Sequence, residues 1–238
     1  MDNATYTTLN RQSGLLREMS AVANNIANLS TTGFRKEGVI FAEFVADLEG
    51  SEPSLSMASA EGRIIDLAQG PLTRTGGTFD FAIEGEGFFM IETPDGNQLT
   101  RAGSFTPSPE GELLTPDGYR LLDTGGGPVF APTDAGPVAL ARDGTLSVAG
   151  NPGAQIGLFL PADAGDLTHR GGTRFAVAGP VDPVEGGSLF QGFLENSNVN
   201  AVEEITRMIE VQRAYEMGQG FLDSEDQRIR SVIQTFGR

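Results

Sequence analysis

The sequence predicts an α+β protein, in which long N- and C-terminal helices pair as a coiled coil and a mainly antiparallel β domain is inserted between them. The first observation is the distribution of turn residues. Residues 70–192 hold 24 of the 32 glycines and 12 of the 13 prolines, whereas residues 1–30 hold only Gly14. Frequent turn residues favour short strands, and their scarcity permits long helices. The second observation is a seam of apolar residues, at spacings of three and four, at each end of the chain.

The C-terminal seam is the longer of the two and runs from Ala201 to Phe236. It is polar at Gln212, Gln219 and Asp226, and polar seam positions usually fix register or partner at some cost in stability. A helix of this length spans about 50 Å, so we expect its apolar stripe to extend beyond what the rest of the chain can cover. We predict that the following seam residues pack against other subunits: Leu9, Leu16, Met19, Ala23, Ile26, Ile205, Met208, Tyr215, Leu222, Ile229 and Ile233.

The ends of the two helices follow from local signals. The N-terminal seam predicts a helix from about residue 4 to about residue 29, which is about 40 Å long. Asn198 or Asn200 is expected to cap the C-terminal helix, because Asn is a favoured N-cap residue and acidic side chains follow at Glu203 and Glu204.

Turn motifs organise the predicted β domain. Pro94-Asp95-Gly96 and Pro116-Asp117-Gly118 each separate two apolar runs, which is typical of β-hairpins, and Asp143-Gly144 marks a third turn. Strands are predicted at 79–83, 88–92, 98–101, 113–114, 119–122, 145–148, 156–160 and 174–177.

Residues 30–75 follow neither pattern. Phe41, Phe44, Val45 and Leu48 could form two helical turns, and we expect neighbours to order the remainder. The predicted divisions are an N-terminal helix at 1–30, an extended bridging segment at 31–75, a β domain at 76–192 and a C-terminal helix at 193–238.

Composition narrows the class of partner. Apolar residues make up 39% of the chain and charged residues 20%, and the formal net charge of −16 would repel nucleic acid or anionic lipid. The chain has no cysteine, no visible cleavable signal and no apolar run long enough to span a membrane. We therefore expect a cytoplasmic protein, unless it is exported by a route that uses no cleaved signal.

The residues offer little for catalysis. His169 is the only histidine and is expected on a solvated loop, so a metal site based on histidine would need carboxylates for all its other ligands. A carboxylate pair for glycoside hydrolysis is the one scheme that the composition permits, with Asp80, Glu84, Glu86 and Glu92 as candidates. We predict that the chain is not an enzyme and has no catalytic, cofactor-binding or metal-binding residues.

Several runs of sequence resemble the bacterial flagellar rod and hook proteins. At the N-terminal end, ANNIANLSTTGFR (residues 23–35) is similar to the signature of that family. The runs QGPLTRTG (69–76), DFAIEGEGFF (80–89) and RAGSFT (101–106) follow in the family's order.

The C-terminal end carries the same resemblance. QGFLENSNVN (191–200) leads into MIEVQRAYE (208–216), which is similar to the family's C-terminal helix. The chain length and the ending FLDSEDQRIR (221–230) are most similar to proximal rod proteins, with distal rod proteins as the close alternative.

The resemblance implies a structural subunit of the flagellar basal body. Such a subunit leaves the cytoplasm unfolded through the flagellar type III export apparatus, without a cleaved signal peptide. It then packs with other rod subunits and with copies of itself in a rod that spans the periplasm, where residues 31–75 bridge neighbours. The export gate would read a short apolar motif, for which Phe41 with Val45 or Phe44 with Leu48 have a suitable spacing.

Two other hypotheses remain open at this stage. The chain could be a self-contained β-rich binding module whose terminal helices fold back on it, since an amphipathic helix most often packs on its own domain. It could also be a glycosidase that acts on cell-wall polysaccharide. Neither hypothesis includes nucleic acid as a partner, and the rod hypothesis includes no small-molecule substrate.

Overall fold

A computed structural model describes residues 2–46, 55–132, 136–184 and 186–236 of the chain. These residues form two compact units. Unit 1 contains the first 27 residues, Glu37–Ile64 and Asn200–Arg238, and unit 2 contains Asn28–Lys36 and Ile65–Val199. Each unit has its own packing, and the fold is α+β, as the sequence predicts.

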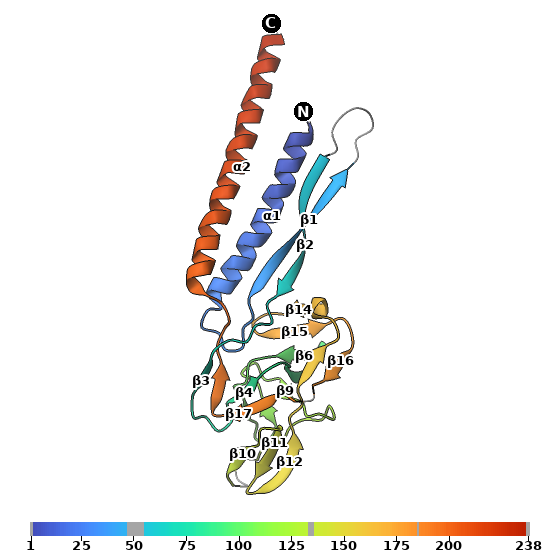
Figure 1. Ribbon diagram of the computed structural model, residues 1–238, viewed down its shortest axis with the longest axis vertical. Coiled ribbons are helices and arrows are strands. Elements are labelled where there is room, and N and C mark those ends of the chain that lie inside the picture. The colour runs from blue at the N-terminus through green and yellow to red at the C-terminus, as the bar shows by residue number, and fades with distance from the viewer. Residues whose placement is uncertain (1, 47–54, 133–135, 185, 237–238) are drawn as a thin grey trace. The chain divides into compact units, whose positions relative to one another are not determined.

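Unit 1 consists of two long helices and a strand pair (Figure 1). Helix α1 spans Asp2–Ala27 and helix α2 spans Ala201–Phe236, and the two lie side by side in opposite directions. Strands β1 (Glu37–Ala46) and β2 (Leu55–Ile65) form a two-stranded sheet.

The strand pair corrects one prediction. Phe41, Phe44 and Val45 belong to β1 and not to two helical turns, whereas Leu48 lies outside the described residues. The apolar spacing that indicated a helix occurs in a segment rich in β-branched and aromatic residues, which favour a strand once a second strand pairs with it.

Unit 2 is the β body. Its largest sheet has seven strands in the order β14-β15-β6-β5-β9-β8-β7, and all the strand pairings described in the body are antiparallel. The strands of this sheet are β5 (Phe89–Thr93), β6 (Gly96–Thr100), β7 (Thr106–Pro107), β8 (Leu113–Leu114), β9 (Arg120–Leu121), β14 (Leu167–His169) and β15 (Arg174–Val177).

Smaller sheets complete the body. Strands β10, β11 and β12 form a three-stranded sheet, and the pairs β13-β16, β17-β4 and β18-β3 form three two-stranded sheets. A short 3-10 helix, Ala164–Asp166, precedes β14. These strands are β3 (Leu72–Arg74), β4 (Phe81–Glu84), β10 (Val138–Leu140), β11 (Thr145–Val148), β12 (Asn151–Gln155), β13 (Phe159–Pro161), β16 (Val181–Pro183), β17 (Ser188–Gln191) and β18 (Phe193–Glu195).

The predicted hairpins are confirmed. Phe89 pairs with Thr100 and Thr93 with Gly96 around the first turn, and Leu114 pairs with Arg120 around the second. The strand predicted at 156–160 is misplaced, because β13 begins only at Phe159. Residues 156 and 158 are buried in the larger core of the body, so their apolar character reflects core packing rather than a strand ladder.

The body is stabilised by two hydrophobic clusters. The larger one is centred on fully buried Phe81, Phe89, Leu113 and Leu121. The smaller one packs Phe88, Leu99 and Phe175 with three further residues. Burial of a large apolar side chain contributes about 1.5–3 kcal/mol, so these clusters make the body the more stabilised part of the chain.

Candidate functional site

Three polar contacts fix how the helices of unit 1 face each other. Gln12 Nε2 donates to the carbonyl oxygen of Tyr215 at 2.8 Å, and Arg207 Nε donates to Glu18 Oε1 at 2.6 Å. Asn25 Nδ2 donates to Glu204 Oε2 at 3.0 Å. In an antiparallel pair, one residue number rises as the number of its facing partner falls, so the two have a constant sum. In these three contacts the sum is about 227.

Each helix covers only one stripe of the other. In α1 the buried residues recur at spacings of three and four, and include Gln12, Leu15, Val22 and Asn25. In α2 the covered stripe consists of Ala201, Glu204, Met208, Val211, Tyr215, Gly218, Leu222 and Glu225, which are buried or half-buried.

The eleven predicted interface residues are divided between covered and uncovered faces. Met19, Ile26, Met208, Tyr215 and Leu222 are half-buried within unit 1. The six that remain exposed are Leu9, Leu16, Ala23, Ile205, Ile229 and Ile233. An isolated chain thus leaves more than half of the predicted set in contact with water.

In α2, one of the two rows that make up the covered stripe is shifted by one residue from the predicted seam. Glu204, Val211 and Gly218 face α1, whereas the sequence pattern favours positions 205, 212 and 219. Glu204 faces α1 because it accepts a hydrogen bond from Asn25. Position 218 can face α1 closely because it is a glycine, since a Cβ there would meet Gln12 Nε2. Hydrophobicity cannot predict either role.

Asn25 is the polar centre of unit 1. Its Oδ1 accepts from the backbone N–H of Glu37 at 2.9 Å, and its Nδ2 donates to the Glu37 carbonyl oxygen at 2.8 Å as well as to Glu204. The side chain therefore pairs with β1 as a neighbouring strand would, and it is fully buried. One amide thus connects α1, α2 and the strand pair.

The N-cap of α2 is confirmed at one of the two predicted positions. Asn200 Oδ1 accepts from the Val202 N–H at 3.0 Å, which satisfies a backbone donor of the first turn. Asn198 has a different task in unit 2: its Oδ1 accepts from Lys36 N at 2.7 Å, and its Nδ2 donates to the carbonyl oxygens of Asp66 and Ala68.

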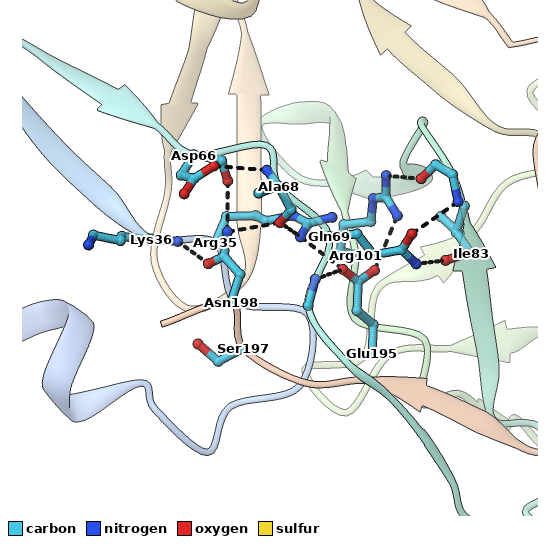
Figure 2. Close-up of polar contacts among 12 residues, drawn as sticks. Arg35, Lys36, Asp66, Ala68, Gln69, Ile83, Arg101, Glu195, Ser197 and Asn198 are labelled. Atoms are coloured by element: carbon cyan, nitrogen blue, oxygen red, sulfur yellow. Dashed lines mark hydrogen bonds and ion pairs between the residues drawn. The ribbon is translucent and has the colours of Figure 1, made fainter. Parts of the chain in front are cut away.

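Unit 2 contains a buried ionic cluster that joins three chain segments (Figure 2). Glu195, at the end of β18, accepts from Arg35 Nη1 at 2.8 Å through Oε1 and from Arg101 Nη1 at 3.1 Å through Oε2. The N–H of Gly70 also donates to Oε1, at 2.9 Å. All three ionic side chains are at most 3% exposed. We call Arg35, Arg101 and Glu195 the junction cluster.

Burial controls the electrostatics of the junction cluster. Burial lowers the pKa of Arg35, while Glu195 and Asp66 partly oppose the change. Burial likewise lowers the pKa of Arg101, to about 10, and Glu195 is the largest opposing influence. Arg101 therefore stays charged at neutral pH, and Glu195 is the carboxylate that the two guanidinium groups share. Arg101 also donates to the Gly85 carbonyl oxygen at 2.8 Å and lies over the Phe88 ring.

The junction cluster lies where both terminal segments of unit 2 meet the body. Arg35 belongs to Asn28–Lys36, which follows α1 in sequence, and Glu195 lies five residues before Asn200, the N-cap of α2. The cluster therefore fastens both terminal segments of unit 2 to the body. Arg35 and Glu195 both lie within runs quoted above for their resemblance, but no spacing rule connects residues so distant in sequence.

The candidate carboxylates for chemistry have other partners or are exposed. Asp80 Oδ2 accepts from Thr75, Glu92 contacts Arg120, and Glu84 and Glu86 are exposed. Within the described residues, no group of three or more His, Asp or Glu side chains could hold a metal ion. No helix among these residues is long and apolar enough to cross a membrane.

His169 is not on a solvated loop, so that prediction is wrong. It is the last residue of β14, pairs with Phe175, and is half-buried. Its ring centroid lies 4.3 Å from that of Phe175 and 5.4 Å from that of Phe34. Strand pairing places the imidazole beside Phe175, a position that the glycines after His169 did not indicate.

Comparison with known proteins defines the class first. Three family profiles match the chain: a flagella basal body rod protein profile at residues 6–35, a flagellar hook protein FlgE/F/G D1 domain profile at 82–148, and a flagellar basal body rod FlgEFG protein C-terminal profile at 191–235. These profiles describe structural parts of the flagellum, and their order follows the chain.

Individual relatives then narrow the assignment. The chain is 40% identical to the flagellar basal-body rod protein FlgF of Caulobacter vibrioides, over 100% of this chain and 99% of the relative. It is 35% identical to FlgF of Mesorhizobium japonicum with the same coverage, and 31% identical to FlgG of Bacillus subtilis over 98% of both chains. The chain therefore belongs to the flagellar basal-body rod protein family, and the resemblance stated from the sequence is confirmed.

Proposed function

We propose that the chain assembles through α1 and α2 into the flagellar rod, where it transmits torque across the periplasm. The proximal rod is the proposed location, with the distal rod as the alternative. The observation that carries this proposal is the uncovered apolar surface of the helices: Leu9, Leu16, Ile205 and Ile229 are each between 44% and 50% exposed. Large apolar side chains in such numbers at regular spacing mark a protein–protein contact surface.

The proposed partners are other rod subunits and copies of this chain. Helices α1 and α2, within residues 1–30 and 193–238, would form the rod core and pair as a coiled coil. Residues 31–75 would bridge neighbouring subunits, and residues 76–192 would lie outside. During secretion the partner would be the flagellar type III export apparatus, which takes the unfolded chain without cleaving a signal peptide. The chain would not be an enzyme and would need no cofactor.

Energetics support assembly through these surfaces. Removing apolar surface from water contributes about 25 cal/mol per Å². Ordering the helix ends costs about 1–2 kcal/mol per residue, so assembly and ordering would occur together. A short row of exposed apolar side chains therefore offsets the cost of ordering the helix ends only when several neighbouring subunits pack against it.

The charge distribution also favours contact through the helices. Residues 1–27 are neutral, because Asp2 and Glu18 balance Arg11 and Arg17. Residues 200–238 carry seven acidic and five basic residues, a net charge of −2, which leaves −14 of the total −16 on residues 28–199. Copies that meet through their helices would therefore bring nearly neutral segments together.

The test replaces two exposed leucines. In the bacterium that makes this chain, the double variant Leu9→Ser, Leu16→Ser should abolish swimming and remove the chain from isolated basal bodies. Its circular dichroism as a purified monomer should be unchanged, because neither side chain is buried. The matched control is Arg213→Ser, an exposed helical position.

Two outcomes would count against the proposal. Normal swimming by the double variant would show that the exposed stripe is not an assembly surface. Loss of function on replacing exposed Glu84 and Glu86 by Gln, with the rod still assembled, would favour the hydrolase hypothesis instead.

A further inference from the structure

The apolar stripe of α2 would accept α1 in more than one register. One row of the stripe that α1 covers recurs every seven residues, at Ala201, Met208, Tyr215 and Leu222. The next residue at this spacing is Ile229, which α1 does not cover. A shift of α1 along α2 by seven residues, which is about 10 Å, would lay α1 on the same stripe again. Ile229 would then take the place that Leu222 has now.

Hydrophobicity alone favours the shifted register. The observed register leaves Ile229 44% exposed and covers Glu204, which is 2% exposed. In the shifted register Val211 would lie where Glu204 lies now. Because Glu204 now faces Asn25, a shift of seven residues would place it beyond Ala27, the last residue of α1. A buried charge is costly unless it is paired, so a polar contact must hold the observed register.

The Asn25 amide makes the contact that a shift would break most completely. It is fully buried, and its Nδ2 donates to Glu204 and to the carbonyl oxygen of Glu37, the first residue of β1, while its Oδ1 accepts from the Glu37 N–H. A shift along α2 would take the carboxylate away from this amide. Leaving a buried polar group unpaired costs more than a formed hydrogen bond contributes, and a polar residue in a helix seam can therefore fix the register.

The chain that follows α1 is long enough to permit the shift. The first backbone contact beyond the helix end that ties this segment to a distant strand is at Gly33, whose N–H donates to the Glu195 carbonyl oxygen at 2.7 Å. Residues 28–32 lie between α1 and this contact, and they include a turn in which the Thr31 N–H donates to the Asn28 carbonyl oxygen at 3.2 Å. Five extended residues span up to about 17 Å, so opening the turn would supply the length needed.

We propose that Asn25 selects the observed register against the shifted one and thereby determines which part of α2 stays uncovered. This inference goes beyond the proposed function, because it concerns the single chain. The two other polar contacts select less strongly. Arg207, which pairs with Glu18, is 52% exposed, and exposed ion pairs contribute little. Gln12 donates to a backbone carbonyl oxygen, a group that every residue of α2 has.

Distances between spin labels report the register directly. The chain has no cysteine, so labels can be attached to a pair of introduced cysteines in the full-length protein. Ser13→Cys is combined with Ser231→Cys in one sample and with Glu203→Cys in another, and all three positions are exposed. The shift would bring residue 13 closer to residue 231 and take it away from residue 203, by about 10 Å in each case. Pulsed electron paramagnetic resonance of the dilute monomer measures both distances.

Asn25→Leu should change the two distances in opposite directions, by about 10 Å each, because a leucine side chain cannot donate a hydrogen bond to Glu204. Combining Asn25→Leu with Glu204→Leu should restore the original distances, because the buried charge is removed and an apolar side chain at position 204 gains from being covered. The matched control is Asn10→Leu, the same substitution at an exposed position of α1, which should leave both distances unchanged.

Three results would overturn the inference. Unchanged distances in Asn25→Leu would show that other contacts or the chain connections hold the register. Distance distributions that broaden without a new maximum would show that the helices separate and have no second register. A shift in Asn25→Leu that the added Glu204→Leu does not reverse would show that the contact between Asn25 and Glu204 is not what selects the register.

Discussion

The helix pair and the β body differ in how completely their apolar residues are covered. In unit 2, Phe81, Phe89, Leu113 and Leu121 are fully buried, and the junction cluster is buried in the same unit. In unit 1, α2 has 36 residues, but Val211 is its only buried apolar side chain within the described part. The body thus buries its large apolar residues within a single chain, whereas most apolar side chains of α2 stay exposed. The proposed function would account for this difference, because neighbouring subunits would cover the exposed helix faces.

The largest expected effect on the body follows from replacing the shared carboxylate of the junction cluster. Glu195→Gln leaves Arg35 and Arg101 buried without their counter-charge. Breaking a buried ion pair by removing one partner costs about 3–5 kcal/mol, so the free energy of unfolding of the body should fall by that amount. Urea denaturation of the full chain, followed by circular dichroism, measures it.

Glu92→Gln is the matched control for that variant. Glu92 contacts Arg120 at 3.4 Å, with both side chains about half exposed. Exposed ion pairs contribute about 0–1 kcal/mol, so the control should unfold almost as the wild type does. Equal losses in the two variants would show that the junction cluster has no special role.

A smaller loss is expected where a glycine allows close backbone contact. Gly33 has a φ of +74°, and a Cβ there would lie 2.2 Å from the backbone nitrogen of Ala102. Gly33→Ala should therefore cost about 1–2 kcal/mol for the left-handed backbone and about 1–3 kcal/mol more for overpacking.

Gly76 isolates the first of these two contributions. Its φ is +75°, but nothing lies within 4 Å of the position a Cβ would take. Gly76→Ala should lose only the conformational part, about 1–2 kcal/mol. Thermal unfolding of both variants measures the difference, and a Gly76→Ala variant as unstable as Gly33→Ala would contradict this explanation.

The smallest effect concerns the helix pair and should have opposite signs at two neighbouring glycines. Gly220 in α2 has open space around it, so Gly220→Ala should stabilise the helix by about 0.5–1 kcal/mol. At Gly218 a Cβ would lie 2.1 Å from Gln12 Nε2, which would have to leave the Tyr215 carbonyl oxygen. Gly218→Ala should therefore lose the gain, as helicity measured during thermal unfolding will show. Equal stabilisation by both substitutions would mean that α1 does not approach α2 at Gly218.

The sequence predicted the elements whose signals are local. The terminal helices follow from spacing, the hairpins around Pro94-Asp95-Gly96 and Pro116-Asp117-Gly118 from turn chemistry, and the Asn200 cap from side-chain type. Each of these signals acts within a few residues, so a single sequence contains it.

The sequence did not predict the features that depend on distant partners. Strand β1 was misread as helical turns because its identity depends on β2, and the covered row of α2 shifted because Asn25 draws Glu204 inward. The junction cluster joins residues 94 and 160 positions apart in sequence, since Arg101 and Arg35 meet at Glu195. Charge pairing over such separations leaves no periodic signal.

Hydrogen exchange of the full chain, as a dilute monomer and within isolated basal bodies, tests the central claim most directly. The account predicts that the backbone amides of the β body exchange equally slowly in both states. Residues 226–236 at the end of α2 and the N-terminal turns of α1 should exchange rapidly in the monomer and become protected on assembly. Slow exchange along the whole of α1 and α2 in the dilute monomer would contradict the account, because the helices would then be complete without neighbours.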